Sequence, residues 1–333
     1  MDGTLVATSG ECKQGMDIAS GGVWGYQTLV LSLAETGEVL GLVNRPSHEG
    51  AAAEADRAIA LCRRAGFRTI LLRGDTDFSQ TAHLDRWNDE GVQFLFGMDV
   101  TPNREVQADD LSEELWEELQ RAPRYQVKTQ PRRRPENVKE EIVRQRGFEN
   151  IRLESEEIAE FTYRPANCQQ DYRMIVLCKH LAIEKGQQQL FEDYRYFFYI
   201  TNDWSTSAAE LVFSANHRCN QENLIGQLKS GVRSLQAPLD NLESNWALMV
   251  MTSLAWNLKA WWALRLPVAP GRWQQRHQQE KQQVLRMEFP TFTAAFMQIP
   301  CQILRSGRRL IYRILNRNPW QAAFLRLADV LQC

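Results

Sequence analysis

The stretch TILLRGDTDF, residues 69–78, is the part of this chain that best indicates its fold. Its apolar half predicts a short buried strand, and Asp75 follows where that strand ends. Ligands of open α/β sheets bind at the carboxyl ends of the strands. Asp75 is therefore a candidate site residue. Asp also suits turns, and Asp77 competes with it two positions further on.

Two more carboxylates lie in separate segments. Asp2 belongs to MDGTLV (residues 1–6), which predicts a strand, and Glu222 belongs to HRCNQENLIGQLK (residues 217–229), which predicts a helix. Lys229 follows Glu222 by two helical turns on nearly the same face. Carboxylates from strands and a helix that meet at one point suit Mg²⁺, because this ion prefers oxygen ligands. Each also has an ordinary interpretation, as a solvated residue near a terminus or on a helix.

Together these segments resemble the DDE transposases of bacterial insertion sequences, in the branch that carries a Tyr–Arg–Glu–Lys signature. That signature has two residues between Tyr and Arg, three between Arg and Glu, and six between Glu and Lys. Arg218, Glu222 and Lys229 match the last two spacings, whereas Ala215 occupies the Tyr position. The strings DGTL and RGDTDF match the other family markers. The resemblance runs from residue 1 to about residue 265.

The resemblance implies an α/β fold, with an RNase H-like mixed sheet flanked by helices, a β-rich insertion and an α-helical C-terminal region. The first part of the core would span residues 1–100 and the insertion residues 101–195. The second part of the core, with the catalytic helix, would span residues 196–265. The helical C-terminal region would span residues 266–333.

The resemblance also implies an activity, which is metal-dependent cleavage of transposon-end phosphodiesters and strand transfer into target DNA. Asp2, Asp75 and Glu222 would be catalytic and would hold two Mg²⁺ (or Mn²⁺) ions, which stabilise the entering and leaving oxygens of an in-line displacement. The partner would be double-stranded DNA, both the inverted-repeat ends and the target. We expect a bacterial cytoplasmic, nucleoid-associated protein with no membrane partner, and a homodimer stays open.

Basic and aromatic residues near Glu222 are candidate DNA contacts. Arg218 and Lys229 would meet phosphates, since Arg offers a planar fork and Lys a compact charge. Arg218 and Glu222 could instead form a surface ion pair at i and i+4. Trp204 either stacks on an extruded base or packs in the core, which is the favoured alternative. Two further groups either contact DNA or solvate the surface: Arg132–Arg134 in a loop, and Arg305, Arg308, Arg309, Arg313 and Arg317 at helix-like spacing.

The composition is that of an ordinary globular protein, with 333 residues, 44% of them hydrophobic and 24% charged. The net charge of −2 does not indicate nucleic-acid binding, but a local basic surface would suffice. The seven cysteines form no Cys-x-x-Cys pair, so a reducing cytosol fits better than a zinc site or a disulfide framework. The apolar stretch 246–264 is long enough to span a membrane, but Asn257 and Lys259 interrupt it and favour a buried helix.

Local patterns predict several further elements. Thr36-Gly37 divides two β-rich runs within residues 24–46, which indicates a hairpin. Helical periodicity covers residues 49–66 and ends at Gly66, and Ser79 is the expected N-cap of a helix through Trp87. Further strands are expected in VQFLFGMD, EIAEFTYRP, YRMIVLCKHL and YRYFFYITN, and a Trp-rich helix, a Gln-rich segment and a basic helical tail follow.

One departure from the family concerns the N-terminus. The first catalytic Asp should lie well inside a strand, after an end-binding region, whereas only Met1 precedes Asp2. We therefore expect an N-terminally truncated chain with impaired activity. The main alternative is a non-catalytic DNA-binding or transposition-regulating remnant, which metal-dependent nicking would distinguish. A haloacid dehalogenase-like phosphatase, which DGTL also suggests, is disfavoured because no residue exists at its nucleophile position, two before Asp2.

Overall fold

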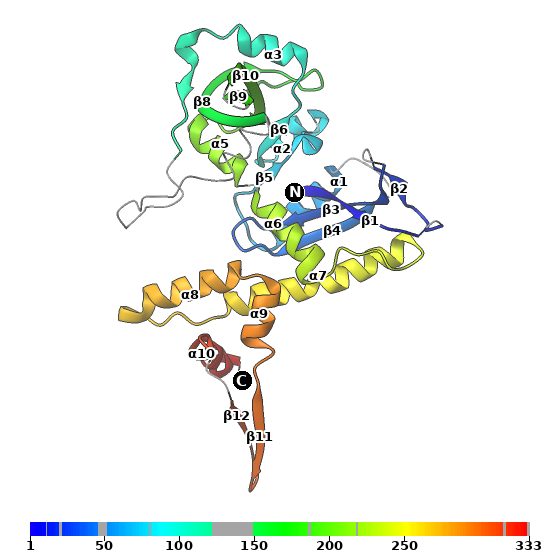
Figure 1. Cartoon of the computed structure of the whole chain (residues 1–333), viewed down its shortest axis with the longest axis vertical. Coiled ribbons are helices and arrows are strands. Elements are labelled where there is room, and N and C mark those ends of the chain that lie inside the picture. Colours follow the sequence, from blue (N-terminus) through cyan, green and yellow to red (C-terminus); the bar gives the residue numbers. More distant parts are fainter. Residues whose placement is uncertain are drawn as a thin grey trace. The chain divides into compact units, whose positions relative to one another are not determined.

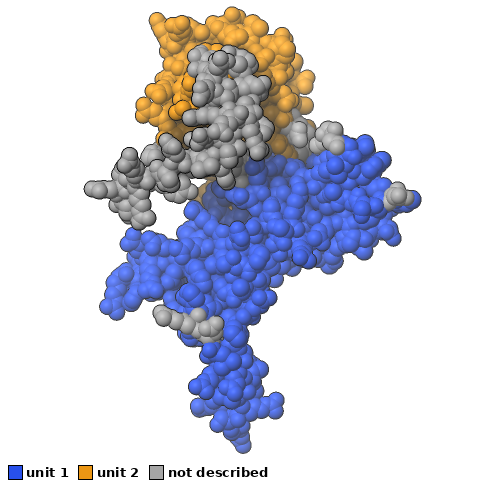
Figure 2. All heavy atoms as spheres, in the orientation of Figure 1, with its two compact units in different colours: residues 1–65, 219–333 blue, residues 66–218 orange. Residues whose placement is uncertain are grey.

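A computed structural model describes residues 1–10, 12–19, 22–45, 52–79, 81–121, 149–185, 188–217, 219–315 and 318–331. The chain divides into two compact units, shown in Figure 2. Unit 1 comprises Met1–Ala65 and Cys219–Cys333, and unit 2 comprises Gly66–Arg218. Five arginines singled out in the sequence lie outside the described residues: Arg132, Arg133, Arg134, Arg218 and Arg317.

Unit 1 contains a four-stranded sheet centred on β3 (Trp24–Ser32), which Figure 1 shows in blue. β1 (Asp2–Ala7) pairs antiparallel with one edge of β3. β4 (Val39–Arg45) and the short β2 (Asp17–Ile18) pair antiparallel with the other edge. The turn between β3 and β4 uses Gly37 at φ +74°, a left-handed conformation that suits glycine. This confirms the hairpin that the sequence predicts at Thr36-Gly37.

Two helices pack against this sheet. Buried apolar residues of α6 (Cys219–Gly226) and of the first part of α7 (Leu242–Leu264) form one core with the apolar side chains of β1, β3 and β4. α1 (Ala52–Arg64) packs beside β4 and ends before Gly66, as the periodicity predicts. The core residues that α6, the turn after it and α7 contribute are Leu224, Ile225, Leu228, Met249 and Trp256.

The polar residues inside the apolar helix α7 bond to other parts of unit 1. Asn257 forms two bonds with the backbone of Val39, which donates its N–H at 2.8 Å and accepts from Nδ2 at 2.9 Å. Lys259 is 1% exposed and donates its Nζ to the carbonyl of Leu285 at 2.8 Å. The helix is buried on this face only, because Met251 and other apolar residues of the opposite face are exposed. No helix in the described parts of the chain is both long and apolar enough to span a membrane.

The C-terminal part of unit 1 is mainly helical, as expected. The end of α7 packs with α8 (Gln274–Arg286), α9 (Phe289–Phe296) and α10 (Gln321–Leu331) in a second core. The expectation of a continuous basic helix is wrong, however. The arginine cluster lies on an antiparallel hairpin of β11 (Cys301–Ser306) and β12 (Arg309–Ile314). The turn between them holds Gly307 at φ +59°, and its Ser-Gly pair is a turn signal that the helical interpretation overlooked.

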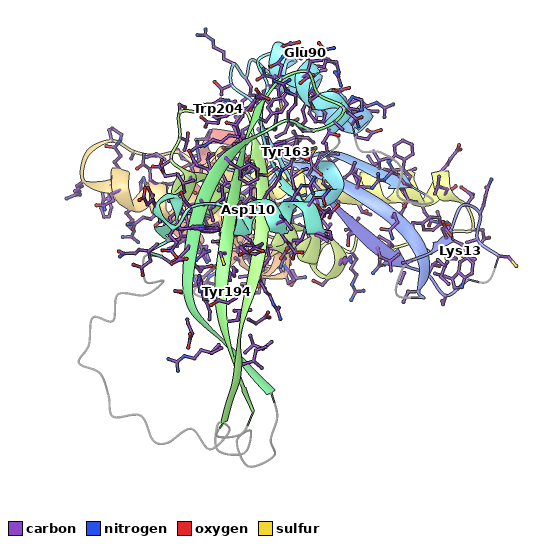
Figure 3. The ribbon with its side chains drawn as sticks, turned by 90° about the horizontal axis from the view of Figure 1, so that it is seen from above. Lys13, Glu90, Asp110, Tyr163, Tyr194 and Trp204 are labelled. Atoms are coloured by element: carbon purple, nitrogen blue, oxygen red, sulfur yellow. The ribbon has the colours of Figure 1, made fainter. Side chains whose placement is uncertain are left out.

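Unit 2 is built on a mixed six-stranded sheet with the order β5-β6-β10-β9-β8-β7. Within this sheet, only the β5–β6 pair is parallel. The long strands β8, β9 and β10 run side by side (Figure 3) and contain three of the predicted strand motifs. The strands are β5 (Leu71–Gly74), β6 (Gln93–Met98), β7 (Glu117–Glu118), β8 (Glu149–Tyr163), β9 (Tyr172–Lys185) and β10 (Gln188–Thr201).

Helices flank this sheet, so the predicted class of mixed sheet and flanking helices is confirmed. α5 (Ala208–Asn216) packs with Leu95, whereas the neighbouring β6 residue Phe96 contacts Trp87 of α2 (Leu84–Asp89). Alternate residues of a strand face opposite sides, so the two helices cover opposite faces. A third helix, α3 (Pro102–Asp109), follows β6.

One detail of unit 2 differs from expectation. Ser79 is not the N-cap of α2, because its hydroxyl donates back to the carbonyl of Thr76 at 2.7 Å and two short 3₁₀ turns precede the helix. The strands β8, β9 and β10 belong to the same sheet as β5 and β6. β10 pairs with β9 on one side and with β6 on the other, so these strands extend the sheet of β5 and β6.

Candidate active site

Asp2 is the first residue of β1 and pairs with Val30 of β3. It is only 7% exposed, although it lies one residue from Met1. The interpretation of Asp2 as a solvated terminal residue is therefore wrong. A carboxylate is costly to bury unless it is paired, hydrogen-bonded or bound to a metal, and Asp2 does take part in an interaction within the chain.

Glu222 lies in the first turn of α6, on the solvent-exposed flank of the helix. The opposite flank packs into the core through Leu224, Ile225 and Leu228. Successive residues of an α-helix are 100° apart. Glu222 therefore lies on a different side of the helix from the residues that pack against the sheet, and its side chain is exposed.

Gln221 joins α6 to the strand beside Asp2. It is 8% exposed, its Nε2 donates to the carbonyl of Val30 at 3.0 Å, and its Oε1 accepts from the hydroxyl of Ser32. Since Val30 pairs with Asp2, the residue before Glu222 is bonded to the strand segment opposite Asp2. Sequence reasoning missed Gln221. The spacing of Gln221, Leu224, Ile225 and Leu228 is i, i+3, i+4, i+7, which marks a buried helix face and was the available signal.

A π-helical turn, Gln227–Gly231, follows α6. Such turns are rare and frequently occur at functional sites. Lys229 lies in this turn and is exposed, and its pKa is lowered because neighbouring atoms desolvate part of the side chain. The seven-residue spacing places Glu222 and Lys229 on one face only in a regular α-helix. The wider turn therefore changes the angle between them.

Asp75 directly follows β5 in unit 2 and begins a 3₁₀ turn. Its carbonyl accepts from the N–H of Phe78 at 3.1 Å, and its carboxylate oxygen Oδ1 is buried. Asp75 thus lies at the strand end and also in a turn, and its role as a ligand stays a prediction. Gly74 is required here because a Cβ on it would lie 2.7 Å from the Cβ of Phe78. Arg73 fixes the strand end to α5 by donating Nη1 to the carbonyl of Ser214 at 2.9 Å.

Trp204 lies in the loop between β10 and α5 (Figure 3) and is 56% exposed, so the expected core packing is wrong. The loop is nonetheless well ordered by hydrogen bonds. The carboxylate of Asp203 accepts from the hydroxyls and backbone N–H groups of Ser205 and Thr206. Burial by itself would raise the pKa of Asp203, but these bonds outweigh it and lower the pKa to about 2. Trp204 is therefore presented to solvent on a pre-formed loop.

The donors of the candidate site are carboxylate oxygens, which suit Mg²⁺ and Mn²⁺. Asp2 and Glu222 lie on neighbouring elements of unit 1. Among the residues that the structure describes, no three His, Cys, Asp or Glu side chains form a group that could hold a metal ion. Asp75 belongs to unit 2, so the convergence of the three carboxylates stays a prediction.

Comparison with known proteins gives one family. A family model described as transposase DDE domain group 1 matches residues 1–333. No curated protein matches the sequence. Among solved structures, the chain is similar to a cryo-EM structure of the piggyBac transposase synaptic complex with hairpin DNA, at 10% sequence identity and a TM-score of 0.37. The match covers 89% of this chain and 52% of that one, so the chain spans about half the length of that transposase.

Proposed function

Because the chain belongs to the family of transposase DDE domains, group 1, we propose that it cleaves phosphodiesters at transposon ends and joins the freed strand to target DNA. One structural observation supports this activity more than any other. Gln221 fixes the helix of Glu222 to the strand pair that carries buried Asp2. Residues held on packed elements are better ordered than residues on mobile loops, and catalysis depends on such order.

We assign the metal site to Asp2, Asp75 and Glu222. Two Mg²⁺ or Mn²⁺ ions held there would neutralise the charge on the entering and leaving oxygens of an in-line displacement. The protein would orient the attacking water or 3′-hydroxyl and the scissile phosphate. Arg218 and Lys229 would bind neighbouring phosphates, which requires a guanidinium or ammonium at the surface. Lys229 meets this condition, since it is exposed.

Trp204 would stack on an unpaired base at the DNA end, because aromatic rings form sequence-tolerant platforms for bases. Its exposure on an ordered loop supports the assignment. Trp204→Ala should weaken binding to an end with one unpaired base about tenfold. It should leave binding to a fully paired duplex unchanged, and an equal loss for both DNAs would contradict base stacking. Trp24→Ala is the control, because that indole is exposed to a similar degree.

The partner would be double-stranded DNA, as inverted-repeat ends and as target, and the location would be the bacterial nucleoid.

The test is nicking of DNA that carries the inverted repeats flanking the gene, with Mg²⁺, Mn²⁺ or EDTA. Glu222→Gln keeps the size of the side chain and removes its charge, so the rate should fall about a thousandfold, or roughly 4 kcal/mol. Glu243→Gln is the matched control, since Glu243 is another exposed carboxylate in the first turn of a helix of unit 1.

The alternative is a DNA-binding regulator that does not cut. It would replace the transposase proposal if the wild type and Glu222→Gln bind the ends equally and neither nicks them with Mg²⁺ or Mn²⁺. Equal nicking by both proteins would show that Glu222 is not part of the active site.

A further inference from the structure

The hairpin of β11 and β12 projects away from the helices of unit 1 (Figure 1). Eleven of its twelve strand residues are exposed, and only Ile314 is half-buried. Isolated two-stranded hairpins are at best marginally stable in water. Because its strand residues are exposed, the hairpin has two uncovered faces, and a partner bound to one of them would stabilise it.

Alternation along the strands gives the two faces different chemistry. One face is mainly apolar, with Ile303 and Tyr312 directly opposite each other at its centre. The other is polar at both ends, because Gln302 pairs with Arg313 and Ser306 with Arg309. Arg308 adds another cation in the turn. We call the face with Gln302, Ser306, Arg309 and Arg313 the polar face.

The charge around the hairpin is one-sided. From Phe289 to Ala328 the chain contains six arginines and no Asp, Glu, Lys or His, although the whole chain has a net charge of −2. The four described arginines of the hairpin, Arg305, Arg308, Arg309 and Arg313, make no side-chain hydrogen bond or ion pair with any described residue. Their guanidinium groups are thus available to an external anion.

We propose that the polar face of this hairpin binds duplex DNA, with Arg309 and Arg313 neutralising backbone phosphates. The proposal rests on the proposed function, because a transposase must hold DNA outside the cleavage site as well as in it. A two-stranded ribbon fits the major groove of B-DNA, and arginine forks match phosphate geometry. A second copy of the hairpin is a poorer partner for this face, because it would bring arginines together without a carboxylate to neutralise them.

The test measures the affinity of the full chain for duplex DNA in EDTA, as a function of salt concentration. Each phosphate contact contributes a slope of about −0.9 in log K against log salt for B-DNA. The double variant Arg309→Gln/Arg313→Gln should therefore have a slope less steep by about 1.8 and bind about tenfold or more weakly near 0.1 M salt. Arg309→Lys/Arg313→Lys keeps both charges and should retain most of the slope.

The control is Arg64→Gln/Arg286→Gln, which removes two exposed arginines of the same unit from the last turns of α1 and α8. The hairpin proposal fails if the control and the hairpin double variant change the slope equally. It also fails if neither changes it, in which case the arginines only protect exposed strand edges from pairing. Circular dichroism and thermal unfolding of each variant identify any loss of affinity caused by misfolding. If the glutamine variant misfolds, the salt dependence of the Arg309→Lys/Arg313→Lys variant decides whether the two charges bind DNA.

The outcome is separable from that of the proposed function, because binding in EDTA needs no cleavage. A hairpin that contributes to binding in a chain that never nicks DNA would support this inference and overturn the activity. A chain that nicks transposon ends but binds DNA equally with and without Arg309 and Arg313 would support the activity and overturn the hairpin inference. If Ile303→Ser/Tyr312→Ser changes the oligomeric state in sedimentation while the arginine variants bind DNA like the wild type, the hairpin is an interface between copies instead.

Discussion

Gln221 of α6 donates its Nε2 to the carbonyl of Val30 in β3 at 3.0 Å, and Val30 is the residue that pairs with Asp2. This bond connects the helix that carries Glu222 to β3, the strand that pairs with Asp2 of β1, although the two elements are far apart in the sequence. The position of Glu222 relative to Asp2 therefore depends on a side chain that has no place in the family signature.

Replacing Gln221 should disturb catalysis more than binding. Gln221→Ala leaves the buried carbonyl of Val30 and the hydroxyl of Ser32 without this partner, which should lower the free energy of unfolding by about 1–3 kcal/mol. The nicking rate at saturating DNA should fall more than the affinity, because the variant misplaces Glu222. Urea unfolding, rate and affinity measurements check this, with exposed Asn220→Ala as control. Equal losses in rate and affinity would contradict a positioning role.

Lys229→Ala tests the proposed phosphate contact of the π-helical turn. The slope of log K against log salt should become less steep by about 0.9, because one phosphate contact is lost. The control is Arg64→Ala, which removes one exposed charge elsewhere in unit 1. An unchanged slope for Lys229→Ala would leave this lysine as a solvated surface residue.

Gly74→Ala should destabilise unit 2. The added Cβ would meet Phe78 at 2.7 Å, and Phe78 is only 3% exposed, so the turn after β5 must shift. Overpacking of this kind costs about 1–3 kcal/mol, which thermal unfolding measures. Gly3→Ala is the matched control, because its Cβ meets nothing within 4 Å. If both substitutions lower the melting temperature equally, the close approach of Phe78 is not the reason for glycine at position 74.

Lys259 should make stability depend on pH in the alkaline range. Burial lowers its pKa from 10.5 to about 8 in the folded protein. Between these values the unfolded chain binds more protons, so the free energy of unfolding rises with pH across this window, by roughly 1.4 kcal/mol for each pH unit. Below pH 8 the full cost of burying the charge remains.

The comparison with Lys259→Met isolates this effect. The difference in unfolding free energy between wild type and Lys259→Met should change in favour of the wild type as pH rises from about 8 to 10.5, in urea titrations. Lys281→Met is the control, since Lys281 is half-buried and also bonds a helix-end carbonyl, that of Leu264. A pH-independent difference for Lys259→Met would mean that the buried amine keeps its ordinary protonation.

The sequence by itself determined the local elements whose signals lie within a short window. Thr36-Gly37 was sufficient for the β3–β4 hairpin, periodicity for α1, and the apolar run for α7. The apolar run before Asp75 was sufficient to place it at a strand end, and the local sequence around Glu222 to place that residue on a helix. These features follow from backbone preferences and side-chain periodicity, which neighbouring residues alone establish.

Only the tertiary structure decided which elements pair and what each polar residue contacts. Asn257 interrupts an apolar run in the sequence, but in the fold it bonds the backbone of Val39, and Asp2 next to the terminus is buried on β1. Trp204, expected in the core, is exposed, and the basic tail forms a hairpin. Burial and strand pairing join residues that are far apart along the chain, so their energies depend on partners that no local window contains.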